Sequence, residues 1–385
     1  MSFVELSVIC LVALVGPVLA LRRSWHLPVV LGELLAGIAL GRTGSGYLHP
    51  GDPTFTFLAD AGFALVMFVA GSHVPVRDPS LRPALRAGVL RAIGVGVVAT
   101  GLGYLLAAVF DVHHAPLYAV LMASSSAALI LPIVDSLGLG GEQVLGLLPQ
   151  IAIADAACIV ALPLVIDPAH AGRAALGAVT VLAAAAVVFV MLRHLEVSGV
   201  RRRVHDVSEE RRFAIELRVQ LTILFLLAGL AVKMHVSIML AGFAFGLLVA
   251  AIGEPRRLAR QLFAVTEGFL GPVFFVWLGA TLQLRELGSH PRLILLGLCL
   301  GLGAALAHLA VRALGQPVPL GLLATAQLGV PVAAATVGQQ LGVLVPGEAS
   351  ALMLGALVSI TIAVVGGSLA ARAGLVATSE KPAHD

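Results

Sequence analysis

Apolar segments long enough to cross a lipid bilayer recur along almost the whole chain of 385 residues. Hydrophobic residues make up 59% of the sequence, and charged residues make up 12%, about half of their usual share in a soluble domain. A chain with so little polar surface cannot face water on all sides. In lipid, an α-helix satisfies its own backbone hydrogen bonds. The sequence therefore predicts an all-α polytopic membrane protein.

The apolar segments are separated by breaks that carry proline, glycine or charge. A helix needs about 20 apolar residues to cross the hydrocarbon core of a bilayer, and on this basis we expect about thirteen transmembrane helices. Their approximate ranges are 3–21, 27–42, 55–75, 84–110, 115–137, 143–166, 173–193, 213–232, 236–252, 260–283, 291–314, 318–342 and 349–371.

The basic residues indicate how these helices are oriented. If the N-terminus lies outside, 18 of the 24 Lys and Arg residues fall on the inner side, five fall on the outer side, and Arg218 lies within a helix. Basic residues concentrate on the cytoplasmic side of membrane proteins. We therefore expect the N-terminus outside and the C-terminus in the cytoplasm. Residues 196–212 are expected to form a cytoplasmic linker, and residues 372–385 a short cytoplasmic tail.

Two halves of the chain carry similar motifs in the same order. Residues 35–41 read LAGIALG and residues 240–246 read LAGFAFG, so five of seven positions match. Phe68-Val69 near Gly71 likewise matches Phe275-Val276 near Gly279, and Pro132 matches Pro331. Each matching pair is seven expected helices apart, and because seven is odd, the second copy enters the membrane from the opposite side. The pattern predicts two inverted six-helix repeats. The first, together with a linking seventh helix, covers residues 1–195, and the second covers residues 213–371. Inverted repeats are typical of secondary transporters.

One segment in each repeat places a proline within a span, after small polar residues. These segments are Ser124–Pro132 and Thr325–Pro331. A proline removes a backbone donor and disturbs the preceding turn, so we expect two broken helices that cross near the membrane midplane. The expected crossover residues are Ser124, Pro132, Thr325 and Pro331, and the candidate cation ligands are Ser125, Ser126 and Gln327. Two proline-kinked helices with packing serines are the alternative.

Asp155 lies near the middle of the sixth expected span, with apolar neighbours on both sides. An acid at such a depth is costly and usually marks an ion or proton path. Its carboxylate can be neutralised by a proton or by a monovalent cation, but not well by both together. We therefore predict that Asp155 carries the ion and the proton. A structural ion pair, for example with Arg218, is the alternative.

Other ionisable and metal-binding residue types carry weaker signals. Glu33 and Glu267 lie nearer to helix ends, where capping is as good an interpretation as transport. Packing is the expected role of His73 and His308. The three cysteines are far apart and form no metal-binding or redox spacing. We therefore expect no cofactor, no enzymatic activity and no nucleic-acid partner.

Several motifs together resemble the second family of monovalent cation:proton antiporters, which includes bacterial Na⁺/H⁺ exchangers and Kef-type K⁺/H⁺ systems. The resemblance rests on His26–Gly37, on Met67–Gly71, on the serine run with Pro132 and Asp155, and on two later motifs, Ala241–Gly246 and Gly271–Val276. It implies a core domain that moves past a dimerisation domain in a homodimer. It also implies a location in the bacterial plasma membrane and an essential aspartate that Asp155 matches.

Three positions depart from the family pattern. Ala154 stands where the family usually has Asp, Asn or Gln, no lysine occurs in the tenth expected helix, and Ser72-His73 replaces Leu-Glu. The first two departures leave one ionisable ion ligand, so exchange is expected to be electroneutral. Because the sequence ends soon after the last span, we also expect no nucleotide-binding domain of the kind found in Kef-type members.

The predicted function is secondary antiport of Na⁺ or K⁺ against H⁺ by alternating access. The alternatives are a sodium-coupled symporter of an organic solute and a membrane channel or receptor that does not carry out coupled transport. A symporter of organic acids needs a cationic pocket, and Arg218 is the one intramembrane cation that the sequence offers.

Overall fold

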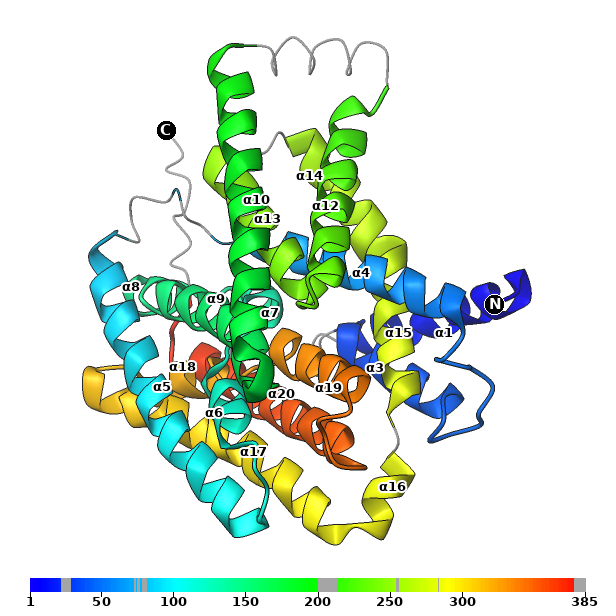
Figure 1. The fold of residues 1–385 in the computed structure, drawn as a ribbon. Coiled ribbons are helices and arrows are strands. Elements are labelled where there is room, and N and C mark those ends of the chain that lie inside the picture. Colours follow the sequence, from blue (N-terminus) through cyan, green and yellow to red (C-terminus); the bar gives the residue numbers. More distant parts are fainter. Residues whose placement is uncertain are drawn as a thin grey trace. The chain divides into compact units, whose positions relative to one another are not determined.

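The computed structural model describes residues 1–21, 29–72, 74, 77, 82–199, 213–253, 256–282 and 284–376. Within these ranges the regular structure is helical, apart from an isolated antiparallel bridge between Leu139 and Val376 (Figure 1). The prediction of an all-α chain is confirmed. Residues 200–212 of the expected linker and residues 377–385 of the expected tail lie outside the described residues.

Nine helical segments in the described part of the chain are long and apolar enough to cross a membrane. They are Phe3–Ala20, Pro53–Ser72, Ala84–Phe110, Glu142–Val165, Pro168–Val197, Ile215–Lys233, Gln261–Thr281, Pro291–Leu314 and Glu348–Arg372. Two shorter apolar helices, α3 (Val29–Leu40) and α13 (Ile238–Ile252), occupy further expected spans. Two broken helices occupy the remaining two. Because these four segments are short or interrupted, the count of thirteen crossings stays a prediction.

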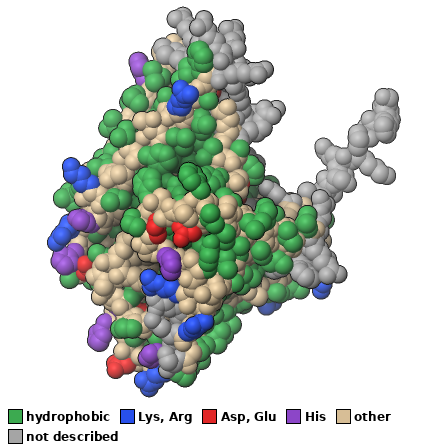
Figure 2. Space-filling view, turned by 90° about the vertical axis from the view of Figure 1, so that its right-hand side faces the viewer, with side chains coloured by type: hydrophobic (Ala, Val, Ile, Leu, Met, Phe, Trp, Pro, Cys, Tyr) green, Lys and Arg blue, Asp and Glu red, His purple; other side chains and the backbone are tan. Residues whose placement is uncertain are grey.

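Large apolar side chains are exposed along the long helices. On α5 (Arg82–Phe110) and α10 (Ala171–Val197), for example, Ile93, Val97, Val187 and Val190 are each more than half exposed. Hydrophobic side chains also occupy much of the surface drawn in Figure 2. Apolar surface on this scale is unfavourable in water and favourable against lipid tails. The molecule is therefore an integral membrane protein.

The chain divides into two compact units, each made of segments from both halves of the sequence. Unit 1 comprises Met1–Leu21, Val29–Arg77 and Ile159–Arg285, and unit 2 comprises the remaining residues. The helix α9 (Leu147–Val165) contributes to unit 2 as far as Cys158 and to unit 1 beyond it. These units are spatial groupings, so the division into sequence repeats stays a prediction.

Unit 1 is held together by close helix pairs at glycines. Its helices are α1 (Phe3–Ala13), α2 (Val15–Ala20), α3, α4 (Pro53–Ser72), α10, α12 (Ile215–Lys233), α13, α14 (Arg256–Val265), a π-helical turn at Thr266–Leu270, and α15 (Gly271–Thr281). α3 packs on α15, and α4 packs on α13. At Gly37 the carbonyl of Val276 lies where a Cβ atom would stand, and at Gly246 the carbonyl of Phe68 does so. The two glycine motifs found in the sequence therefore make these contacts.

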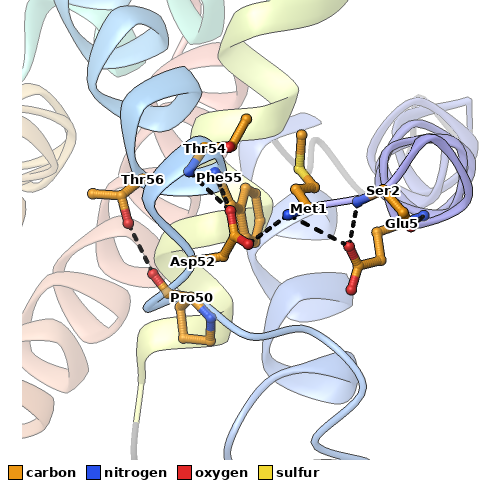
Figure 3. Close-up of polar contacts among 8 residues, drawn as sticks. All are labelled: Met1, Ser2, Glu5, Pro50, Asp52, Thr54, Phe55 and Thr56. Atoms are coloured by element: carbon orange, nitrogen blue, oxygen red, sulfur yellow. Dashed lines mark hydrogen bonds and ion pairs between the residues drawn. The ribbon is translucent and has the colours of Figure 1, made fainter.

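The N-terminal segment of unit 1 is anchored by polar contacts at the start of two helices (Figure 3). The Met1 ammonium group pairs with Asp52, whose Oδ1 also accepts hydrogen bonds from the backbone N–H groups of Thr54, at 2.8 Å, and Phe55, at 3.0 Å. The ammonium group of Met1 lowers the pKa of the Asp52 carboxyl below its ordinary value. Asp52 therefore fixes the loop that leads into α4.

Unit 2 contains the two broken helices. The first is α6 (Ala115–Ala123) followed by α7 (Ala127–Ser136), and the second is α18 (Val318–Leu323) followed by α19 (Gly329–Leu341). Around them lie α5, α8 (Glu142–Leu145), the first part of α9, α17 (Pro291–Ala310) and α20 (Glu348–Arg372). α17 packs against α5, α6, α18 and α20, and α20 packs against α7, α18 and α19. The helices of unit 2 thus support both breaks.

Candidate functional site

The two helix breaks touch each other inside unit 2. The first break covers Ser124–Ser126, and the second separates Leu323 from Gly329. The backbone N–H of Ser126 donates to the carbonyl of Ala326 at 2.7 Å. Backbone groups that the helical ladders leave free thus find partners in the opposite break, as they must at membrane depth. The prediction of crossed, broken helices is confirmed by this contact.

Both breaks lie inside the predicted segments, and each proline lies in the half-helix that follows its break. Pro132 is the sixth residue of α7, and Pro331 is the third residue of α19. A proline in the first turn of a helix is tolerated because its missing N–H would have no partner there. Pro331 therefore follows the second break, and α7 continues through Pro132. The interruptions lie at the small polar residues that precede each proline.

Asp155 joins the crossover from α9. It is buried, with 6% of its surface exposed, and its Oδ2 accepts a hydrogen bond from the backbone N–H of Ala127 at 3.1 Å. Ala127 is the first residue of α7, so the carboxylate lies at the positive end of a half-helix, which favours a negative charge. In the part of the chain that the structure describes, Asp155 forms no ion pair, and its second oxygen has no hydrogen-bond partner.

The serines of the first break have different partners. Ser124 Oγ donates to the carbonyl of Leu121 at 2.8 Å, within its own helix end. Ser125 Oγ lies 2.8 Å from the carbonyl oxygen of Ala324 and 3.1 Å from His308 Nε2. Ser126 contacts the second break through its backbone, and its hydroxyl makes no hydrogen bond to the described residues. All three serines are buried.

The second break is held by α20. Thr325 Oγ1 donates to the carbonyl of Leu322 at 2.6 Å and lies 3.2 Å from the carbonyl oxygen of Ser359. The backbone N–H of Gln327 donates to Ser359 Oγ at 3.3 Å. The Gln327 side chain is buried, and its Nε2 has no hydrogen-bond partner among the described residues. Gln327 therefore places at the crossover an amide nitrogen that has no hydrogen-bond partner among the described residues.

The crossover thus brings the predicted residues together, but they differ in whether their polar side-chain atoms already have hydrogen-bond partners. Asp155, Ser126 and Gln327 each keep one polar side-chain atom without a described partner, whereas Ser124 and Thr325 bond to nearby backbone. Their roles in ion binding remain predictions. The oxygen donors among them have the chemistry that hard cations prefer. No three His, Cys, Asp or Glu side chains group together as a metal site in the described ranges.

Several polar residues in apolar segments make contacts that the sequence did not indicate. His308 is fully buried, as the expected packing role requires, and it is also hydrogen-bonded to Ser125. His73 lies outside the described residues. Gln316 Nε2 donates to Gln150 Oε1 at 2.9 Å, and both residues are buried. Their polarity within apolar segments is the signal that could have indicated them.

Unit 1 also contains acids in apolar helices. Glu33, for which the sequence left capping and transport open, is the fifth residue of α3 and is buried. Asp60 lies in the middle of α4 and is partly buried, and the sequence prediction did not consider it. Asp155 is therefore the acid at the crossover, but it is not the only acid within a span.

Comparison with known proteins agrees with this architecture. The family model described as "Sodium/hydrogen exchanger, transmembrane" matches residues 10–372. The putative Na(+)/H(+) antiporter YjbQ of Bacillus subtilis is 24% identical in an alignment of 379 positions that covers 93% of this chain and 61% of that protein. The probable Na(+)/H(+) antiporter 3 of Methanocaldococcus jannaschii is 25% identical in an alignment of 358 positions that covers 89% of this chain and 88% of that protein. The chain thus spans about three fifths of the length of YjbQ.

Solved structures show the same fold. The sodium proton antiporter MjNhaP1 from Methanocaldococcus jannaschii, determined at pH 8, has a TM-score of 0.63 at 18% identity and covers 95% of both chains. A second structure of that protein, from an electron-microscopy map, has a TM-score of 0.66 at 17% identity over 100% of both chains. With the family model matching nearly the whole sequence, the chain belongs to the transmembrane sodium/hydrogen exchanger family.

Proposed function

We propose that this protein is a secondary antiporter that exchanges a monovalent cation, Na⁺ or K⁺, for H⁺. The observation that carries the proposal is the place of Asp155, a buried carboxylate at the N-terminus of a broken helix. One carboxyl group that holds either a proton or a cation, together with access from alternate sides, is sufficient for obligate exchange. Membership of the exchanger family supports this function over a channel or a solute symporter.

In the proposed mechanism, Asp155 carries the ion, and Ser125, Ser126 and Gln327 supply neutral oxygen atoms. The single N–H donor from Ala127 stabilises the carboxylate in part, which leaves one oxygen for a cation. When the cation leaves, a proton neutralises the group, and burial in an apolar surrounding favours that neutral form. The unit that contains the crossover then moves so that the ion site opens to the other side of the membrane.

We propose the orientation that the basic residues indicate, with the N-terminus outside and the C-terminus in the cytoplasm, in a bacterial plasma membrane. We also propose that the protein works as a homodimer. Exchange is proposed to be electroneutral, because a carrier with one carboxylate is neutral whether it holds H⁺ or a monovalent cation.

Proteoliposomes with an internal pH dye test the proposal. Addition of Na⁺, K⁺ or Li⁺ to wild-type vesicles is expected to drive proton flux, and Asp155→Asn is expected to abolish it because the amide cannot titrate. Asp155→Glu keeps the carboxyl group and is expected to keep part of the activity. Proton flux at the wild-type rate in Asp155→Asn would overturn the assignment of the carrier.

The same vesicles test the charge balance. Valinomycin clamps the membrane potential, with Na⁺ as the driven ion. A shift of about 100 mV acts on each net transported charge with about 2.3 kcal/mol. Electroneutral exchange predicts an unchanged steady-state pH gradient after such a shift. A gradient that follows the potential would indicate a second proton carrier.

A further inference from the structure

The helix α17 passes against both half-helices that lead into the breaks. On its α6 side, the sulfur of Met122 fills the space where a Cβ atom on Gly303 would stand. On its α18 side, a Cβ atom on Gly321 would lie 3.1 Å from the carbonyl oxygen of His308. These close approaches place His308 beside the residues that enter the crossover.

Both ring nitrogens of His308 are engaged. Nδ1 lies 2.9 Å from the carbonyl oxygen of Ala304, one turn earlier in α17, and Nε2 lies 3.1 Å from Ser125 Oγ. A carbonyl oxygen accepts only, so Nδ1 carries the ring hydrogen. In the neutral ring, Nε2 is then an acceptor. The contact with Ala304 therefore fixes what His308 offers to Ser125.

The Ser125 hydroxyl has one hydrogen and two acceptors. It lies 2.8 Å from the Ala324 carbonyl oxygen and 3.1 Å from His308 Nε2. If the hydrogen points to Ala324, the buried Nε2 has no donor. If it points to His308, the lone pairs of Ser125 Oγ and the Ala324 carbonyl are free for another partner. Two residues further along the chain, Ala127 donates to Asp155.

A hydroxyl oxygen binds a cation through its lone pairs, so its hydrogen must point away from the cation, and in a buried site that hydrogen needs an acceptor. We propose that His308 is a positioning residue of the ion site, which accepts the Ser125 hydroxyl hydrogen and leaves Ser125 Oγ and the Ala324 carbonyl free to face the cation. This inference rests on the proposed function. It assigns to His308 an effect on cation affinity, exerted through Ser125 and without direct contact with the ion.

The test compares two substitutions of similar size in proteoliposomes. His308→Leu fills the space but offers no acceptor, whereas His308→Gln places an amide oxygen near the position of Nε2. We expect His308→Leu to raise the KM for Na⁺ about tenfold, the effect of one lost buried hydrogen bond, with a much smaller change in kcat. His308→Gln is expected to restore a KM close to that of the wild type. His113→Gln, at an exposed histidine, is the matched control.

A double substitution separates positioning from packing. In a Ser125→Ala background the Leu and Gln variants are expected to share one KM, because the hydroxyl they act through is absent. Thermal unfolding checks that each variant folds, and His308→Asn, too short to reach Ser125, replaces the Leu variant if that one does not. A KM of His308→Leu equal to that of the wild type would overturn the inference. So would a KM that stays higher for the Leu variant than for the Gln variant in the Ser125→Ala background. If wild-type vesicles show no exchange, the proposed function itself fails.

Discussion

At the scale of single residues, the state of Asp155 depends on one backbone donor. Its carboxylate accepts a hydrogen bond from the backbone N–H of Ala127, the first residue of α7. A hydrogen bond to a charged group contributes about 1.5–3 kcal/mol. This contact is therefore strong enough to influence whether the carboxyl group holds a proton or a cation.

Replacement of Ala127 by proline tests this donor. Proline fits the first position of a helix, so Ala127→Pro removes the N–H while α7 is retained. We expect a rise of tenfold or more in the KM for the driving cation, because the carboxylate that binds it has lost its stabilising donor. The measurement is the initial rate of cation-driven proton flux in proteoliposomes over a range of Na⁺ concentrations.

The matched control is Ala127→Gly, which keeps the N–H and is expected to retain a KM near that of the wild type. If the proline and glycine variants transport with the same KM, the Ala127 donor does not matter for ion binding. In that case the contact seen in the structure would be a consequence of helix packing alone.

At the scale of helices, a buried acid connects the start of α6 to the start of α20. Glu348 Oε1 accepts from the Tyr118 hydroxyl at 2.6 Å and pairs with His114 Nδ1 at 2.7 Å, and its Oε2 accepts from the backbone N–H of Val345 at 2.9 Å. Val345 follows α19 in the chain. The cluster thus connects the start of α6 and the segment that follows α19 to the start of α20.

His114 makes the stability of this cluster depend on pH. The hydrogen bond to Glu348 raises the pKa of His114 above its ordinary value of 6.5, against the opposing effect of burial. A raised pKa means that the stabilisation is fully present below the ordinary value and is lost as the pH rises through the raised value. The folded protein is therefore expected to lose this contribution as the pH rises above the ordinary value of 6.5 and through the raised pKa.

Thermal unfolding in detergent checks this expectation with His114→Gln. The difference in Tm between wild type and variant is expected to be largest below the ordinary pKa of 6.5 and to shrink as the pH rises above it and the wild-type imidazole loses its proton. His113→Gln, at the exposed neighbour, should show no such trend. A difference in Tm that stays constant as the pH rises would contradict the role of the His114 charge.

The helices themselves could be predicted from the sequence because lipid imposes a simple length rule. Long apolar runs such as Glu348–Arg372 were found directly, since only a helix satisfies the backbone there. The position of each break could not be predicted. Pro132 and Pro331 suggested it, but the interruption depends on which backbone groups find partners in the other break, such as Ser126 with Ala326. That contact joins residues 200 positions apart.

The same distinction between local patterns and long-range contacts applies to the site residues. Asp155 was predictable because an acid deep in an apolar span needs a reason to be there. His308 was not, because one histidine on an apolar helix has the same local pattern whether it packs or forms hydrogen bonds. Only the contact with Ser125, across two helices, distinguishes these roles.

At the scale of the whole molecule, the crossover lies within one of the two compact units. Asp155, both breaks and His308 all belong to unit 2, whereas Glu33 and Asp60 belong to unit 1. We propose that an ion at the crossover is held by residues of unit 2. The central claim is that a cation and a proton compete there for the same carboxyl group.

Proton release on cation binding tests this competition most directly. Purified wild-type protein in weakly buffered detergent solution, with a pH dye, receives NaCl, KCl or LiCl, and choline chloride serves as the control salt. Starting pH values are stepped between about 5 and 9, and burial in an apolar surrounding favours the protonated carboxyl group at the lower values. At those lower values we predict one proton released for each cation bound by the wild type and no release by Asp155→Asn. Equal proton release from Asp155→Asn, or cation binding to the wild type without proton release at every pH, would contradict it.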